Sequence, residues 1–132
     1  MKQKKKSFTL SEVLLAAVIL AVSFCALLLV FITSALLNAS SRGLTVAMTH
    51  AQYIMEEVKN TNFSQIKTDI NNNVWDLGVS DIESRGLSPL NSETIDTEVT
   101  GTALLDITVT VNWQERSGRN MSTAIETLIA QP

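Results

Sequence analysis

The chain is short and acidic and contains one cysteine. Its 132 residues are 45% hydrophobic and carry a formal net charge of −3. A single cysteine excludes an internal disulfide, and scattered basic residues beyond the first six positions argue against a nucleic-acid partner.

The N-terminal stretch combines a basic start with a long apolar run. Four lysines lie in residues 2–6, and Val13 to Leu37 contains no proline or glycine. A helix of that length, roughly 37 Å, exceeds a hydrocarbon core of about 30 Å. The run is also longer than the ~7–15 residues of a signal-peptide core. Positive charge stays on the cytoplasmic side of a membrane, so the four lysines predict the orientation of this run. We expect a single membrane-spanning segment, with the rest of the chain outside the cytoplasm.

Glu12 is the one acidic residue at the mouth of this run. An ionised carboxylate at the edge of hydrocarbon costs free energy unless it reaches the headgroups or is paired. From the position alone, both a headgroup location and a functional role are open.

The string from Lys6 to Leu15 resembles the class III signal of type IV pilins and type II secretion pseudopilins. Basic leader, small residue, phenylalanine and a glutamate five residues after the cut are all in register. The resemblance implies that prepilin peptidase cuts between Ser7 and Phe8, which removes residues 1–7, and that the new amino terminus at Phe8 is methylated. It also implies that Glu12 neutralises the terminal amine of a neighbouring subunit. Family members usually carry glycine at the position of Ser7, so Ser7 is a departure.

The resemblance further implies a set of partners. These are other pilins or pseudopilins through the N-terminal helix (8–37, the transmembrane and filament-core half), prepilin peptidase, an assembly platform protein, and the inner membrane before assembly.

A second helical pattern follows within residues 38–60. Apolar residues recur at helical spacing, at Leu44, Ala47, Met48, Ala51, Ile54, Met55 and Val58. We expect one helix over about 8–59, with Gly43 as its weak point. Cys25 is expected to pack between helices, Glu56 and Glu57 to lie on the outer face, and His50 to be solvated or at an interface rather than bound to metal.

Residues 61–93 lack a long regular pattern. Phe63 to Ile70 predicts a short helical turn with Phe63, Ile66 and Ile70 facing inward. Residues 71–93 read as a variable loop. Trp75 would either close the core or present an aromatic side chain to a partner, and we favour the core.

Alternation with a period of two begins at Thr94 and predicts three to four antiparallel strands over 94–130, with Gly118 at positive φ in a hairpin loop. The expected class is α+β, a type IV pilin-like fold. The second half of the long helix would pack on a small sheet in an exported domain, 38–132. Segments of this domain also resemble minor pilins and pseudopilins related to PilV and GspI.

The sequence contains no motif that indicates catalysis. No phosphate loop, Cys/His cluster or nucleophile triad is present. We expect no enzymatic activity, no cofactor and no bound metal. The expected function is that of a minor pilin or pseudopilin, a structural subunit of a type IV pilus or type II secretion pseudopilus that acts in priming or assembly. The alternative is a signal-anchored exported binding module that does not assemble.

Overall fold

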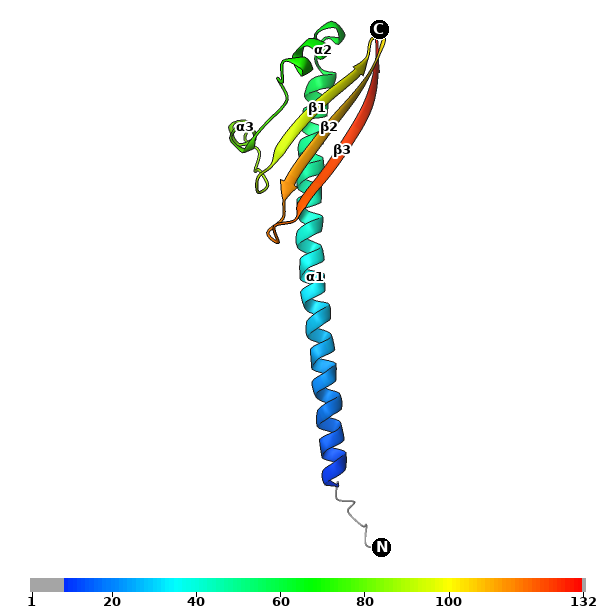
Figure 1. Cartoon of the computed structure of the whole chain (residues 1–132), viewed down its shortest axis with the longest axis vertical. Coiled ribbons are helices and arrows are strands. Elements are labelled where there is room, and N and C mark those ends of the chain that lie inside the picture. Colours follow the sequence, from blue (N-terminus) through cyan, green and yellow to red (C-terminus); the bar gives the residue numbers. More distant parts are fainter. Residues whose placement is uncertain (1–8, 132) are drawn as a thin grey trace. The chain divides into compact units, whose positions relative to one another are not determined.

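The computed structural model describes residues 9–131, which form three helices and one three-stranded sheet (Figure 1). In chain order the elements are α1 (Leu10–Lys59), α2 (Phe63–Asn71), α3 (Val79–Ser84), β1 (Thr94–Gly101), β2 (Leu104–Gln114) and β3 (Asn120–Ala130). The chain divides into two compact units, Met1–Ala39 and Ser40–Pro132. Each unit is described by itself.

The first unit contains the apolar part of α1. All of its described residues from 10 to 39 are exposed. Two of its polar side chains are satisfied inside the helix, because Ser23 and Thr33 donate to the carbonyls of Ile19 and Leu29, each 2.8 Å away. The helix is long and apolar enough to cross a membrane by length and composition.

The second unit is a layer of helix against a layer of sheet. The part of α1 in this unit buries one stripe, consisting of Ala47, His50, Ala51, Ile54, Met55 and Val58. The predicted stripe is therefore confirmed for its central members. Leu44, which was also expected to face inward, is 44% exposed. It lies one turn before the first fully buried residue of the stripe, Ala47.

The sheet is antiparallel with strand order β1-β2-β3. All five inward-facing side chains of β2 are buried against the helix: Leu105, Ile107, Val109, Val111 and Trp113. Three strands and the α+β class are confirmed. The hairpin between β2 and β3 turns at Gly118, whose φ is 82° as a left-handed turn position requires.

Gly43 does not interrupt α1. A Cβ atom there would lie 3.2 Å from Nε1 of Trp113. Ordinary carbon–nitrogen contacts need more room than this. Glycine is unfavourable inside a helix, but its lack of a side chain at position 43 allows the indole of Trp113 to approach α1 closely.

The segment between α1 and β1 is more ordered than its sequence indicated. The predicted helix at Phe63 is confirmed, with Ile66 and Ile70 buried and Phe63 packed beside the core. The prediction of a variable loop over 71–93 is wrong in part, because α3 forms there and buries Ile82. A helix this short buries one apolar side chain and so leaves no periodic pattern to detect. Trp75 is 5% exposed and belongs to the core, as favoured.

Candidate functional site

The start of α1 places Glu12 in contact with Thr9. Oε2 of Glu12 accepts hydrogen bonds from the Thr9 backbone N–H (2.9 Å) and the Thr9 hydroxyl (3.0 Å). The Thr9 carbonyl in turn accepts from the backbone N–H groups of Glu12 and Val13. Thr9 is thus the N-cap residue, and Glu12, three positions later, accepts the Thr9 backbone N–H, which is one half of a capping box. The capping role of Glu12 was not predicted from the sequence, although the Thr-x-x-Glu spacing is typical of a helix N-terminus.

The capping contact leaves half of the Glu12 carboxylate available. In residues 9–131 no hydrogen bond reaches Oε1, and the side chain is exposed. Ser7 and Phe8 lie outside the described residues. The carboxylate can therefore cap its own helix through one oxygen while the other meets a second donor or cation.

His50 lies in the core, and the expectation of a solvated or interface histidine is wrong. Its Nδ1 is 2.7 Å from Oε1 of Glu93, and the two residues are 4% and 0% exposed. Oε2 of Glu93 accepts the backbone N–H of Leu90 at 2.6 Å. Burial of two polar side chains is tolerated because each is hydrogen-bonded. The pairing spans 43 residues of sequence and had no local signal.

Glu57 also differs from its prediction. It forms a salt bridge with Arg85 at the end of α3 and is partly buried, whereas Glu56 is exposed as expected. Both His50 and Glu57 tie α1 to the segment that precedes the sheet. Neither builds a metal site, since residues 9–131 contain no group of three or more metal-ligating side chains.

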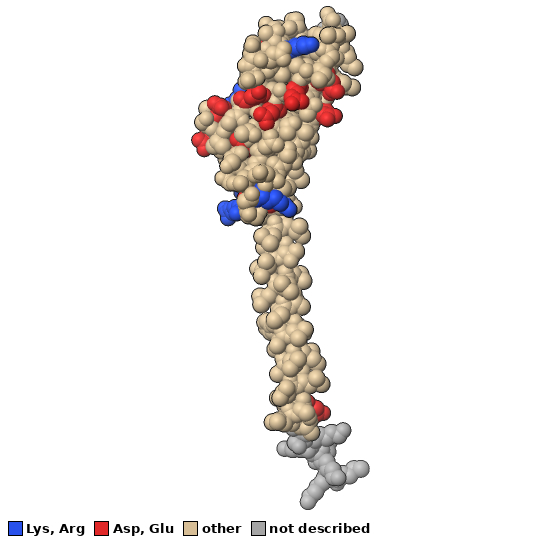
Figure 2. All heavy atoms as spheres, in the orientation of Figure 1, with Lys and Arg blue, Asp and Glu red and all other residues tan. Residues whose placement is uncertain are grey.

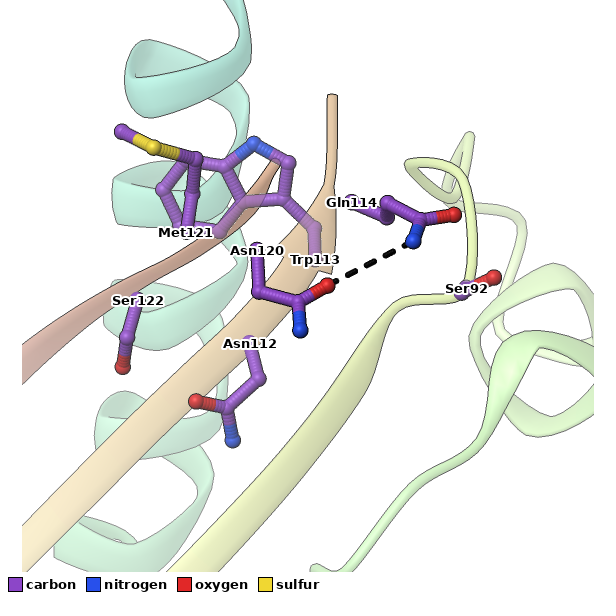
Figure 3. Close-up of a pocket in the computed structure, with 7 residues that line it drawn as sticks. All are labelled: Ser92, Asn112, Trp113, Gln114, Asn120, Met121 and Ser122. Atoms are coloured by element: carbon purple, nitrogen blue, oxygen red, sulfur yellow. Dashed lines mark hydrogen bonds between the residues drawn. The ribbon is translucent and has the colours of Figure 1, made fainter. Parts of the chain in front are cut away.

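A hollow of about 390 Å³ lies on the sheet near the β2–β3 hairpin (Figure 3). It is lined by Ser92, Asn112, Trp113, Gln114, Asn120, Met121 and Ser122. Its amides are engaged with neighbours. Asn112 donates to Asp96 at 2.9 Å, and Gln114 donates to Asn120 at 3.5 Å. None of the lining side chains is an acid, a base or a thiol, so the hollow offers no acid–base chemistry.

Glu115 connects the β2–β3 hairpin to α1. A hydrogen bond from the Ser40 side chain lowers the pKa of the Glu115 carboxyl. Desolvation opposes this shift by raising the pKa, and Arg119 and Ser117 lower it further by smaller amounts. Arg119 lies 3.3 Å from this carboxylate. The hairpin is thereby fastened to α1 three residues after the apolar run ends at Leu37.

No protein-family model, curated protein or solved structure matches the chain. The family resemblance therefore depends on the N-terminal residues and on the segments named in the sequence.

Proposed function

We propose that the chain is a minor pilin or pseudopilin, a structural subunit held in the inner membrane and then incorporated into a type IV pilus or type II secretion pseudopilus. One observation carries the proposal. Glu12 stands at the head of α1 in register with the basic leader and the Ser7–Phe8 junction, and an unbroken apolar helix follows it.

The charge of Glu12 fits a position beside a second subunit. A carboxylate enclosed by apolar helices is costly when unpaired and tolerable when it meets a positive group. Cleavage after Ser7 would create such a group, the amine of Phe8. The exposed Oε1 of Glu12 is the atom that would receive this amine from a neighbour.

The apolar surface of α1 supports the same function. All its described residues from 10 to 39 are exposed, including large side chains such as Leu27, Leu29 and Phe31. A surface of that kind needs lipid or other apolar helices around it. A subunit that moves from membrane to filament exchanges the first environment for the second.

The sequence favours a low-abundance subunit over the major one. The apolar segment has no helix-breaking residue, and the one cysteine, Cys25, lies within that segment. The exported unit therefore folds without a disulfide. Priming or assembly of the filament is the role that these features support.

The decisive experiment separates the charge of Glu12 from its capping contact. Glu12→Gln keeps an oxygen that can accept the Thr9 backbone N–H but removes the negative charge, whereas Thr9→Ala removes the hydrogen bond from the Thr9 hydroxyl and keeps the charge. We expect both variants to insert into the membrane and only Glu12→Gln to lose filament incorporation. Equal incorporation of Glu12→Gln and wild type would remove the role given to Glu12.

Processing is tested by mass spectrometry of the N-terminus in cells that contain prepilin peptidase. We expect a methylated Phe8 start. A chain that retains Met1 would contradict the proposal and favour the anchored binding module. The compactness of the second unit, Ser40–Pro132, is compatible with that alternative. Under it, an unrelated membrane helix in place of residues 8–37 would preserve function.

A further inference from the structure

The two edges of the sheet differ in the hydrogen bonding of their outward backbone groups. At the outer edge of β1, Ile95 and Leu77 exchange two backbone hydrogen bonds of 2.9 Å. The next outward N–H of β1, from Thr97, donates to Oδ1 of Asp76 at 2.8 Å. At the outer edge of β3, in contrast, no hydrogen bond within residues 9–131 reaches the backbone.

The ladder between β2 and β3 identifies the backbone groups on that open edge. At its two ends Glu115 N–H donates to Arg119 and Gln131 N–H donates to Ala103. Backbone hydrogen bonding alternates along an antiparallel pair, so the odd-numbered residues of β3 direct their N–H and C=O groups toward β2. The even-numbered residues direct their N–H and C=O groups outward, and between the two strand ends these are Ser122, Ala124, Glu126 and Leu128.

β3 lacks the features that usually protect an edge strand. Its 11 residues contain no proline, lysine or glycine and one charge, Glu126. Every inward-facing side chain of β3 is only half-buried, whereas those of β2 are all buried. A long, regular edge with partly covered apolar side chains is a template for another strand.

The outer face of the sheet indicates the charge of the incoming strand. Its ionisable side chains are all acidic, namely Asp96, Glu98, Asp106 and Glu126. Figure 2 shows acidic side chains gathered on one face of this part of the molecule. Glu98 and Glu126 occupy one cross-strand row on either side of Thr108. A second copy added through β3 would bring its own acids to this row, which like-charge repulsion disfavours.

We propose that β3 binds an extended segment of a partner protein in which Lys or Arg alternates with apolar residues. The basic side chains would lie beside Glu126 on the outer face, and the apolar ones would cover Met121, Ile125 and Ile129. The backbone would pair with the outward groups of Ser122 to Leu128. This surface belongs wholly to the second unit and does not depend on the filament function.

The test uses the full chain in detergent micelles and a synthetic probe of about nine residues that alternates lysine and isoleucine, the length of an ordinary strand. Hydrogen exchange of the β3 amides and fluorescence anisotropy of labelled probe report binding. We expect slower exchange at Ala124, Glu126 and Leu128. A matched probe with glutamate in place of lysine should bind about tenfold more weakly, because its charges would repel Glu126 and the acidic outer face instead of attracting them.

Ala124 provides a matched pair of variants. Ala124→Pro removes an outward N–H and leaves the ladder to β2 intact, because proline is tolerated where the N–H faces solvent. Ala124→Thr keeps the N–H. We expect the proline variant to lose probe binding and the threonine variant to retain it, with both folded by circular dichroism.

Three outcomes would overturn the proposal. One is unchanged exchange of the β3 amides at about 1 mM probe, within the range of weak binding. Another is equal binding of the lysine and glutamate probes. The third is self-association without probe that Ala124→Pro abolishes, which would assign the edge to a second copy. None of these outcomes affects the Glu12 experiments, which test the filament function.

Discussion

His50 on α1 and Glu93, immediately before β1, form a buried hydrogen bond of 2.7 Å that joins the helix to the chain entering the sheet. Glu93 uses both oxygens, one for His50 and one for the Leu90 N–H. The second unit contains no cysteine and therefore no disulfide. The His50–Glu93 contact and the Glu57–Arg85 salt bridge are polar links that fix residues 85–93 to α1.

Replacing Glu93 with alanine should destabilise the second unit by about 3 kcal/mol, because a buried histidine nitrogen and a backbone N–H lose their acceptors. Glu93→Gln should cost less, about 1–2 kcal/mol, since one acceptor oxygen remains for two donors. Denaturant unfolding of the full chain in micelles, followed by tryptophan fluorescence, gives both values. Equal stability of the alanine variant and wild type would contradict a structural role for the pair.

The double variant His50→Leu with Glu93→Met provides the control. Removing both polar groups avoids the unpaired partner that each single change leaves behind. We expect the double variant to be more stable than the sum of the single changes predicts, with a coupling free energy of about 1 kcal/mol or more. Strict additivity would show that the two side chains act independently.

Asp76 should protect the edge of β1. It accepts both the backbone N–H and the hydroxyl of Thr97 through Oδ1. Asp76→Ala should cost about 1–2 kcal/mol and speed hydrogen exchange at Thr97, because the buried threonine loses both partners. Asp76→Asn keeps an acceptor oxygen and should retain most of the protection. Unchanged exchange at Thr97 in the alanine variant would show that another group protects this edge.

The parts of the fold that the sequence predicted are those that repeat. Alternation of Ile107, Val109 and Val111 with polar residues determined the buried face of β2, and helical spacing from Ala47 to Val58 determined the face of α1. Such patterns exist because each element buries one side. The Thr9–Glu12 contact was not predicted, although the Thr-x-x-Glu spacing that favours it is local and is present in the sequence.

What the sequence could not predict arises from contacts between distant segments. His50 pairs with Glu93, and Glu57 with Arg85, across long stretches whose path was not known. Histidine is intermediate between the residue types that are usually buried and those that are usually exposed, so the burial of His50 could not be inferred without knowing its hydrogen-bond partner. The open edge of β3 likewise became visible only when the strand order and the capped edge of β1 were known.

Ser40 should control the ionisation of Glu115. The Ser40 hydrogen bond is the largest cause of the lowered pKa of Glu115 in the folded chain. A lowered folded pKa contributes stability above the unfolded pKa, and that contribution disappears as pH falls through the folded pKa. Ser40→Ala should therefore raise the Glu115 pKa and reduce this acid-sensitive contribution. An NMR titration of the Glu115 carboxyl measures the shift, with Ser41→Ala as the neighbouring control. A lowered pKa that persists in Ser40→Ala would assign it to Arg119 and Ser117.

Gly43 lies where the indole of Trp113 approaches α1 closely. Because a Cβ at Gly43 would lie 3.2 Å from the indole nitrogen, Gly43→Val should displace the ring and cost about 1–3 kcal/mol through overpacking. Trp113→Phe removes the indole nitrogen that lies closest to position 43, so Gly43→Val should cost clearly less in the Trp113→Phe background. Gly43→Ala tests the same contact more gently, since its gain in helix propensity of about 1 kcal/mol opposes the clash. Unfolding free energies of the four variants and wild type decide the matter. An equal cost of Gly43→Val with tryptophan or phenylalanine at position 113 would show that the glycine is kept for a reason other than this contact.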